Sequence, residues 1–216
     1  LENSCGDGNI LVAVVQRYID DCVANGLSRT RIKNGLARDI YGVEIDPEQF
    51  QKCIENLNKV LEKNNINKVE WKIFNDDYLR WNDVSQFQFI VGNPPYITYS
   101  ELAKDEQKYV KENFNTCVKG KFDYCYAFIE KSIKALAQDG KMAYLIPSSI
   151  FKTVFGLNLR NYIKPYITVI KDYTQEKVFD NALVKSSIMV LDKQRQQGVL
   201  HYRDMTLEKE INIPVN

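Results

Sequence analysis

The sequence has little material for a metal centre. Histidine occurs once in the 216 residues, at His201, and no two of the five cysteines form a CxxC pair. Zinc sites usually combine histidines with closely spaced cysteines. The single histidine and the scattered cysteines therefore do not match the common zinc motifs, and we expect no metal site. We expect reduced thiols in the protein core instead, at Cys5, Cys22, Cys53, Cys117 and Cys125.

Long hydrophobic runs are also lacking. No apolar stretch approaches the roughly 20 residues that span a bilayer, and no signal peptide is visible. The 29 Lys and Arg residues nearly balance the 28 Asp and Glu residues, so the formal net charge of +1 gives no global signal for nucleic acid or a membrane surface. We expect a cytoplasmic protein with no membrane partner, in which any DNA-binding surface is local.

Segments typical of strands and of helices alternate along the chain. Apolar spacing predicts helices over 10–23, 47–63, 122–136 and 157–162, and strands over 40–43, 69–75, 87–92, 140–147, 167–174 and 186–193. Asp46 is expected to cap the second helix, with Pro47 in its first turn. Residues 104–121 are expected to be a loop with a helical piece. This alternation predicts an α/β fold with a mostly parallel sheet, whose ligands bind at the carboxyl ends of the strands.

A glycine-containing turn leads into the first predicted helix. In Cys5-Gly6-Asp7-Gly8-Asn9 the glycines allow a ligand close to the backbone, and the helix start offers free N–H groups. Glu44 ends the next strand, where a carboxylate can accept hydrogen bonds from both ribose hydroxyls. Position 11 is Leu11, so the GxGxxG pattern of dinucleotide-binding oxidoreductases is not met. The turn and Glu44 together favour a nucleoside site.

Two further features concern the same edge of the sheet. Asp77 follows the third strand and can accept a bond from an adenine amino group, with Tyr78 or Ile45 against the ring; a simple turn or cap role is the alternative. Only a few residues, among them Leu1, Glu2 and Asn3, precede the glycine-containing turn, fewer than the about five or six residues of an ordinary strand. We therefore expect the first strand to be truncated.

The segment Asn93-Pro94-Pro95-Tyr96 directly follows the strand predicted at 87–92. Neither proline can donate a backbone hydrogen bond, so the segment is a stiff turn rather than strand or helix. The amide oxygen of Asn93 and the carbonyl of Pro94 can accept both N–H bonds of an exocyclic amine and leave its lone pair available. Tyr96 can stack on a base, worth on the order of 1–3 kcal/mol, which helps to hold a nucleotide extruded from a duplex.

Seven segments in order resemble the gamma-class adenine-N6 DNA methyltransferases of restriction–modification systems. They are LENSCGDGN, YGVEID, NDDYLRW, GNPPYI, KFDYCYAFIEKSIKAL, GKMAYLIPSSIFKT and VFDNALVKSSIMVL. The resemblance covers nearly the whole chain. It implies S-adenosylmethionine as cofactor and a class I methyltransferase (Rossmann-like) fold, with a doubly wound sheet whose last strand inserts antiparallel. It implies methyl transfer to the N6 amino group of a flipped adenine in duplex DNA, with a fused or separate endonuclease as a further partner.

The resemblance also implies roles for individual residues. Glu2 and the Gly6 turn would meet the methionine part of the cofactor, Glu44 the ribose and Asp77 the adenine amino group. The implied cofactor-binding residues are Glu2, Ser4, Cys5, Gly6, Glu44, Ile45, Asp77, Tyr78 and Asn93. The implied catalytic turn is Asn93, Pro94, Pro95 and Tyr96. Phe179 matches the aromatic residue that packs with Tyr96 against the flipped adenine.

We expect residues 1–198 to be the catalytic domain, incomplete at its N-terminus. Residues 199–216 are expected to be an extension, or the start of a linker to an absent target-recognition domain. The family's cofactor segment upstream of the glycine-containing turn is missing from this sequence. Recognition of the DNA sequence is expected in the absent domain, because base edges are read by contacts that this core lacks.

Two other interpretations stay open. Methyltransferases that act on release-factor glutamine or on ribosomal RNA also carry NPPYI, although FDYCYAFIEKSIKAL and PSSIFKT resemble the DNA enzymes. A non-catalytic DNA-binding subunit is the second, although every proposed catalytic group is present. Among other residues, Lys119, Lys121 and Lys152 either line a DNA cleft or form a solvated face. The aromatic residues of 122–128 are expected mostly in the core.

Overall fold

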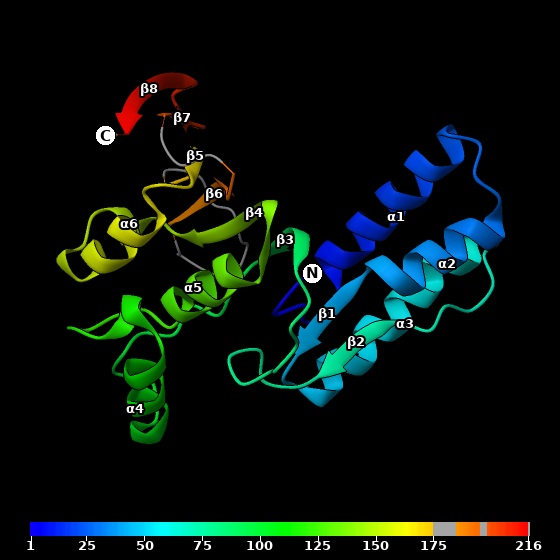
Figure 1. The fold of residues 1–216 in the computed structure, drawn as a ribbon, viewed down its shortest axis with the longest axis horizontal. Coiled ribbons are helices and arrows are strands. Elements are labelled where there is room, and N and C mark those ends of the chain that lie inside the picture. The colour runs from blue at the N-terminus through cyan, green and yellow to red at the C-terminus, as the bar shows by residue number, and fades with distance from the viewer. Residues whose placement is uncertain (175–184, 195–197, 216) are drawn as a thin grey trace. The chain divides into compact units, whose positions relative to one another are not determined.

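In the computed structural model, residues 1–174, 185–194 and 198–215 are described. The chain divides into two compact units, Leu1–Asn82 and Asp83–Asn216 (Figure 1). Within the described ranges, no helix combines the length and the apolar character that crossing a bilayer requires.

The first unit packs its helices on a short parallel sheet. Its elements are α1 (Asn9–Ala24), α2 (Arg29–Asp39), β1 (Tyr41–Glu44), α3 (Pro47–Lys63) and β2 (Lys72–Asn75). β1 and β2 pair in parallel, so Glu44 and Asn75 lie opposite each other at the carboxyl ends. Glu2 forms a single parallel bridge with Gly42, at the place where the first strand was expected.

Helical spacing of apolar residues builds the core of this unit. Leu11, Val15 and Ile19 recur along one side of α1, and Leu57 and Leu61 along α3, each at most 2% exposed. The helix predicted over 47–63 is confirmed at both ends. Its predicted cap is confirmed too, because the side chain of residue 46, an aspartate, accepts hydrogen bonds from the N–H groups of residues 48 and 49.

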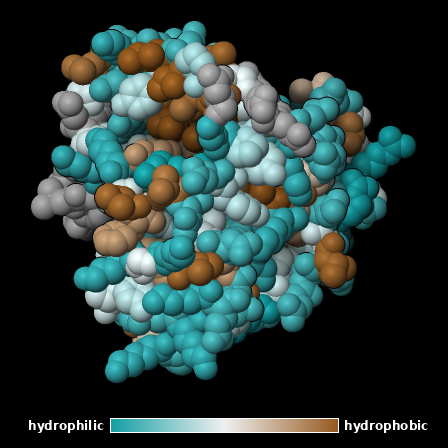
Figure 2. Space-filling model, turned by 60° about the vertical axis from the view of Figure 1, so that its left-hand side comes forward, coloured by the Kyte–Doolittle hydropathy of each residue, from teal (hydrophilic) through white to brown (hydrophobic). Residues whose placement is uncertain are grey.

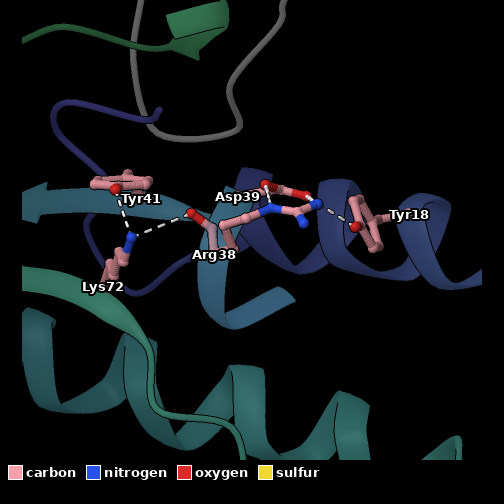
Figure 3. A network of polar contacts seen from close by, with 5 residues as sticks. All are labelled: Tyr18, Arg38, Asp39, Tyr41 and Lys72. Atoms are coloured by element: carbon pink, nitrogen blue, oxygen red, sulfur yellow. Dashed lines mark hydrogen bonds and ion pairs between the residues drawn. The ribbon is translucent and has the colours of Figure 1, made fainter. Parts of the chain in front are cut away.

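Polar contacts fasten the helices to the amino ends of the strands (Figure 3). The hydroxyl of Tyr18 on α1 donates to Asp39 at 3.0 Å, and Asp39 is also ion-paired with Arg38 at 2.6 Å. The Lys72 ammonium on β2 donates to the Tyr41 hydroxyl at 2.6 Å and to the Arg38 carbonyl at 3.4 Å. These residues hold the start of β1 and β2, while the candidate site residues follow the other ends of the strands.

The second unit contains a mixed sheet and three α-helices in the part of the chain that the structure describes. Its strands are β3 (Phe87–Gly92), β4 (Leu136–Pro147), β5 (Ile167–Asp172), β6 (Ser186–Asp192), β7 (Gly198–Asp204) and β8 (Lys209–Val215). Its helices are α4 (Lys104–Asn113), α5 (Cys125–Ala135) and α6 (Leu157–Ile163), with short 3-10 turns η1 (Asn115–Cys117), η2 (Ser148–Phe151) and η3 (Val154–Gly156).

The strand order is β3-β4-β6-β5-β7-β8. β6 runs antiparallel to both β4 and β5, whereas the pairs β3–β4 and β5–β7 are parallel. This confirms the predicted antiparallel insertion of the strand over 186–193. β7 and β8 had no counterpart among the predicted strands; they occupy residues expected to be an extension, and β7 joins the sheet beside β5.

The aromatic residues over 122–128 lie mostly in the core of the second unit, as predicted. Phe122, Tyr126 and Phe128 are 0%, 1% and 6% exposed. Figure 2 shows one face of the molecule, on which hydrophilic side chains predominate and hydrophobic ones form small separate groups. The predicted loop over 104–121 does contain a helical piece, α4.

Candidate functional site

The glycine-containing turn precedes α1 and has the backbone geometry of glycine. Gly6 and Gly8 have φ of 53° and 87°, a left-handed conformation that other residues rarely adopt. A Cβ on Gly8 would lie 2.7 Å from the sulfur of Cys53 on α3, whereas a Cβ on Gly6 would meet nothing within 4 Å. Gly8 is therefore required by packing as well as conformation, and Gly6 by conformation alone.

Glu44 accepts a hydrogen bond from this turn. The N–H of Gly6 donates to Glu44 Oε2 at 2.7 Å, and the N–H of Asp46 donates to Oε1 at 2.9 Å. Each carboxylate oxygen has a second lone pair, so Glu44 can accept further bonds from ligand hydroxyls while the backbone fixes its orientation. The fold thus brings together two predicted site residues that are 38 positions apart.

Glu2 presents a buried acid beside the turn. Its side chain is 2% exposed, and Oε2 has no hydrogen-bond partner among the residues that the structure describes. Burial, with the nearby Cys53 thiol second, raises the pKa of Glu2 to about 9, so the carboxyl is protonated at neutral pH. A buried polar atom without a partner is costly. A ligand that carries a donor or a positive charge would satisfy it.

Residues of α3 support the turn from beneath. A hydrogen bond to Cys53, with burial second, raises the pKa of Cys5, so this predicted site residue is a neutral wall of the turn. The Asn56 amide donates to the carbonyl of Asp7 at 2.9 Å. Neither Cys53 nor Asn56 belongs to a recognisable motif; their spacing of three on a predicted helix was the available signal. Ser4, also predicted, is half-buried.

Asp77 organises the turn that follows β2. Its Oδ1 accepts from the N–H of Leu79 at 2.9 Å, and its Oδ2 is ion-paired with Arg80. Asp77 therefore does have the turn role that was the alternative prediction for it. Arg80, which was not among the predicted site residues, is its ion-pair partner. The N–H of Asp76 donates to the Glu44 carbonyl at 3.0 Å, so the chain after β2 lies at the same strand edge as Glu44.

The two residues predicted to lie against an adenine ring differ in access. Ile45 is 67% exposed directly after Glu44, whereas Tyr78 is 3% exposed and its ring lies 6.3 Å from that of Trp81. Ile45 therefore offers a surface for a ring at this edge, and Tyr78 belongs to the support behind it.

The stiff turn begins immediately where β3 ends, at Gly92. The amide oxygen of Asn93 and the hydroxyl of Tyr96 are both shielded from solvent. Pro94 is buried, and Pro95 and the Tyr96 side chain are half-buried. Burial raises the pKa of Tyr96, although the neighbouring Ser186 hydroxyl opposes the shift, so the phenol stays neutral.

Backbone contacts hold the chain after this turn. The N–H of Tyr124 donates to the Ile97 carbonyl at 2.9 Å, and Thr98 forms an isolated bridge with Asp123. Glu101 accepts from the N–H of Thr98 at 2.8 Å and from its hydroxyl at 2.7 Å. The turn is therefore held by β3 before it and by these contacts after it.

Two remaining expectations concern Phe179 and metals. Phe179 lies outside the described residues. Within the described part of the chain, no three or more His, Cys, Asp and Glu side chains gather as a metal site. The described residues thus offer acceptors for a nucleoside and an amine after β1 and β2, and an amide–proline–tyrosine turn after β3.

Comparison with known proteins gives consistent matches. The sequence pattern of the Eco57I restriction-modification methylase family matches residues 28–179. The type II methyltransferase M.BstVI of Geobacillus stearothermophilus is 31% identical over 195 residues, which are 84% of this chain and 34% of that protein. This chain therefore spans about a third of the length of that relative.

Two solved structures share the fold. A Listeria monocytogenes protein described as a class I S-adenosylmethionine-dependent methyltransferase matches with a TM-score of 0.65 and 19% identity, over 89% of this chain and 52% of that one. The type IIL restriction-modification enzyme MmeI, solved in complex with DNA, matches with a TM-score of 0.66 and 19% identity, over 99% of this chain and 34% of that one. At this identity the likeness establishes the fold, which is the predicted class I methyltransferase fold.

Proposed function

The chain belongs to the Eco57I restriction-modification methylase family. We therefore propose that it is the catalytic core of an adenine-specific DNA methyltransferase. The reaction is methyl transfer from S-adenosylmethionine to the N6 amino group of an adenine flipped out of duplex DNA. The enzyme would act in a restriction–modification system in the cytoplasm.

The observation that carries this proposal is the placement of Asn93-Pro94-Pro95-Tyr96. The turn begins at the carboxyl end of β3, where ligands bind in folds of this type. The residues on both sides of it are fixed by β3 and by the contact from Tyr124 to Ile97. An amide oxygen, a backbone carbonyl and a ring are therefore presented from one stiff support.

Each group of the turn has a defined task in the proposed reaction. The Asn93 amide oxygen and the Pro94 carbonyl accept the two N–H bonds of the adenine amine, which draws its hydrogens away from the lone pair. The acceptors would stabilise the positive charge that develops on the nitrogen, and no general base is needed for the attack. The nitrogen would gain the methyl group and afterwards lose one proton to solvent, and S-adenosylhomocysteine would be the leaving group. Tyr96 stacks on the extruded base. Its phenol is neutral, so it adds no charge beside the nitrogen.

The residues of the first unit fit S-adenosylmethionine, which supplies the methyl group when bound. Glu2 has a buried carboxyl oxygen without a partner among the described residues, as a site for the cationic amino group of the methionine part would require. Glu44 is held by the Gly6 and Asp46 N–H groups with lone pairs left for the ribose hydroxyls. Asp77 would accept from the adenine amino group while it keeps its pair with Arg80.

Other parts of the enzyme belong to the same proposal. We assign residues 1–198 to the catalytic domain. Residues 199–216, which include most of β7 and all of β8, would be an extension or the start of a linker to a target-recognition domain. An endonuclease, fused or separate, would cut unmodified DNA. These assignments agree with the greater length of M.BstVI.

Radiolabelled S-adenosylmethionine tests the substrate. The full-length protein should transfer label to duplex DNA, and hydrolysis of the DNA should give N6-methyladenine. Label in a release factor or in ribosomal RNA, with none in DNA, would move the function to one of the other amino methyltransferases. Binding of DNA with no transfer to any of the three would favour a non-catalytic subunit.

A further inference from the structure

A pocket in the second unit lies next to the stiff turn along the chain, and none of the turn residues lines it. Its volume is about 240 Å³, smaller than the roughly 300–1,000 Å³ of pockets for drug-sized ligands, so it suits a single ring system. Its walls come from the chain after Ile97, from the start of α5 and from the chain after β4. They are Thr98, Tyr99, Ser100, Lys121, Phe122, Asp123, Tyr126, Ser149, Thr153 and Phe155.

The apolar walls of this pocket are aromatic. Phe122 in the lining is 0% exposed, and the ring of Tyr99 is edge-on to it at 5.1 Å. The hydroxyl of Tyr99 accepts a hydrogen bond from Lys111 at 2.7 Å, which fixes the ring. Phe155 is 47% exposed at the rim and packs on Gly120. Flat rings of this kind bind the faces of other flat rings.

The polar group that decides the ligand is Asp123. Its carboxyl is half-buried in the wall and makes no side-chain hydrogen bond with the described residues. Burial, with the nearby Glu101 carboxylate second, raises the pKa of Asp123. Two carboxyl groups so close disfavour an anionic ligand such as a phosphate, despite Lys121 at the rim. They favour a ligand that donates hydrogen bonds.

Donors stand beside this acceptor. The Lys121 ammonium and the hydroxyl of Ser149, both on exposed residues, line the same pocket. An acceptor next to donors matches a nucleobase edge in which an exocyclic amine lies beside a ring nitrogen or carbonyl. Cytosine, adenine and guanine have such an amine, and thymine lacks one.

We propose that this pocket binds a nucleobase that carries an exocyclic amino group, with Asp123 accepting from the amine, and that this base is not the adenine to be methylated. The base lies near the target in the DNA, because Thr98 in the pocket wall follows Tyr96 by two positions. The choice of DNA as its source rests on the proposed function. Asp123 then reads one position of the recognition sequence from within the core, in addition to the contacts expected from the target-recognition domain, so the expectation that the core makes no base contact is revised at this one position.

Nucleoside binding tests the pocket independently of the reaction. Deoxycytidine and thymidine would be titrated into the full-length protein and followed by isothermal titration calorimetry. Deoxycytidine should bind about tenfold more tightly than thymidine, as one good hydrogen-bonded base contact provides. Asp123→Asn and Asp123→Ala should each lower the affinity for deoxycytidine to the affinity for thymidine. Asp139→Asn, at an exposed position on β4, should change neither.

Equal affinity for the two nucleosides, or unchanged preference in both Asp123 variants, would overturn the proposal. If the Asp123 variants melt at a lower temperature than the parent protein, Ser149→Ala provides the second test, because that residue is exposed. This variant should lower deoxycytidine affinity and leave thymidine affinity unchanged. No change in either affinity would count against the pocket.

Methylated positions in a mixed-sequence DNA then test the role in specificity. The parent protein should require an amine-bearing base at one position near the methylated adenine, and Asp123→Asn should relax that position alone. An unchanged recognition sequence would contradict the assignment of Asp123. If the parent protein methylates no DNA, the proposed function fails, whereas the nucleoside titration still decides whether the pocket binds a base.

Discussion

The N–H of Gly6 donates a 2.7 Å hydrogen bond to the Glu44 carboxylate, joining the glycine-containing turn to the end of β1. The second oxygen of Glu44 accepts from the Asp46 N–H at 2.9 Å. The carboxylate is thus oriented by two backbone donors before any ligand is present. Preorganisation of this kind reduces the entropy that binding must overcome.

Removal of this carboxylate should weaken the cofactor complex. Glu44→Ala should lower the affinity for S-adenosylmethionine by about 10- to 150-fold, the equivalent of about 1.5–3 kcal/mol for hydrogen bonds to a charged group. Glu48→Ala, in the first turn of α3, removes an exposed carboxylate near the same helix start and should have little effect. Calorimetric titration measures both. Equal losses in the two variants would show that general charge, rather than the ribose contact, is responsible.

Cofactor binding should release a proton from Glu2. In the free protein burial holds the pKa at about 9, so the group is protonated at pH 7. A cationic amino group beside it favours the ionised form, so about one proton should leave per cofactor bound. Calorimetry in buffers of different ionisation enthalpy measures this release, and Glu2→Gln should abolish it. A parent protein without buffer dependence would exclude the contact.

The same group should make the free protein less stable as the pH rises. The folded-state pKa of about 9 lies above the ordinary value of 4.5, so the folded state binds this proton more tightly than the unfolded state. The contribution is fully present below pH 4.5 and is lost as the pH rises to about 9. Urea unfolding between pH 5 and pH 9 should show a steeper fall in stability for the parent protein than for Glu2→Gln. Identical slopes would contradict the burial of an acidic group at this position.

The two glycines of the turn should differ in their tolerance of alanine. Gly6→Ala should cost about 1–2 kcal/mol of unfolding free energy for its left-handed backbone alone. Gly8→Ala should cost about 1–3 kcal/mol more, because its Cβ would lie 2.7 Å from the sulfur of Cys53. Urea unfolding of the two variants gives the comparison. A larger loss for Gly6→Ala would mean that α3 can move away from a Cβ added at Gly8, contrary to the close contact with Cys53.

Elements with strong periodicity or clear end signals could be predicted from the sequence. The strand 87–92 and the helix 47–63 agree with β3 and α3, because a short apolar run and an Asp46–Pro47 helix start are local signals. α2 was not predicted: Ser28 caps its start, but Ile32 and Leu36 are its only buried hydrophobic residues among the described ones, so its periodicity is weak. β8 was not predicted although Ile211, Ile213 and Val215 alternate along it, because Pro214 argues against a strand; six of its seven residues are exposed.

In the candidate site too, some residues could be predicted from the sequence and others could not. Glu44 and Asp77 could be identified because each follows a predicted strand. Their partners come from elsewhere: Cys53 and Asn56 from α3, and Arg80 from the turn after β2. Contacts of this kind depend on how elements pack, which spacing within one element does not determine.

Asp172 anchors a buried set of hydroxyl groups in the second unit. The Tyr202 hydroxyl on β7 donates to its Oδ2 at 2.9 Å, and the N–H of Thr174 donates to its Oδ1 at 2.8 Å. The Ser148 and Ser187 hydroxyls, 2.8 Å apart, lie within 3.4 Å of the same oxygen. Burial alone would raise the pKa of Asp172, but hydrogen bonds from Thr174 and Tyr202 outweigh it and hold the pKa below its ordinary value.

Loss of one donor from this set should shift acid unfolding. Because the folded-state pKa of Asp172 is lowered, its contribution to stability is present above pH 3.8 and is lost as the pH falls. Tyr202→Phe should cost about 1.5–3 kcal/mol at pH 7 and move acid unfolding to a higher pH. Tyr166→Phe is the control, because its hydroxyl makes no hydrogen bond with the described residues. Equal acid unfolding of both variants would contradict the charge-assisted bond.

In the proposed reaction the Asn93 amide activates the adenine amine while Tyr96 holds the base. The measurement is the rate of methyl transfer by the full-length protein to N6 of adenine in DNA, with cofactor affinity measured in parallel. Asn93→Ala should lower the rate by on the order of 100- to 1,000-fold, as loss of an electrostatic contact to the transition state does, and leave cofactor affinity nearly unchanged. Tyr96→Phe should keep most of the rate, and Tyr96→Ala should lose far more, because the stacking ring is gone. An Asn93→Ala enzyme as fast as the parent protein, or equal rates for Tyr96→Ala and the parent, would contradict the account.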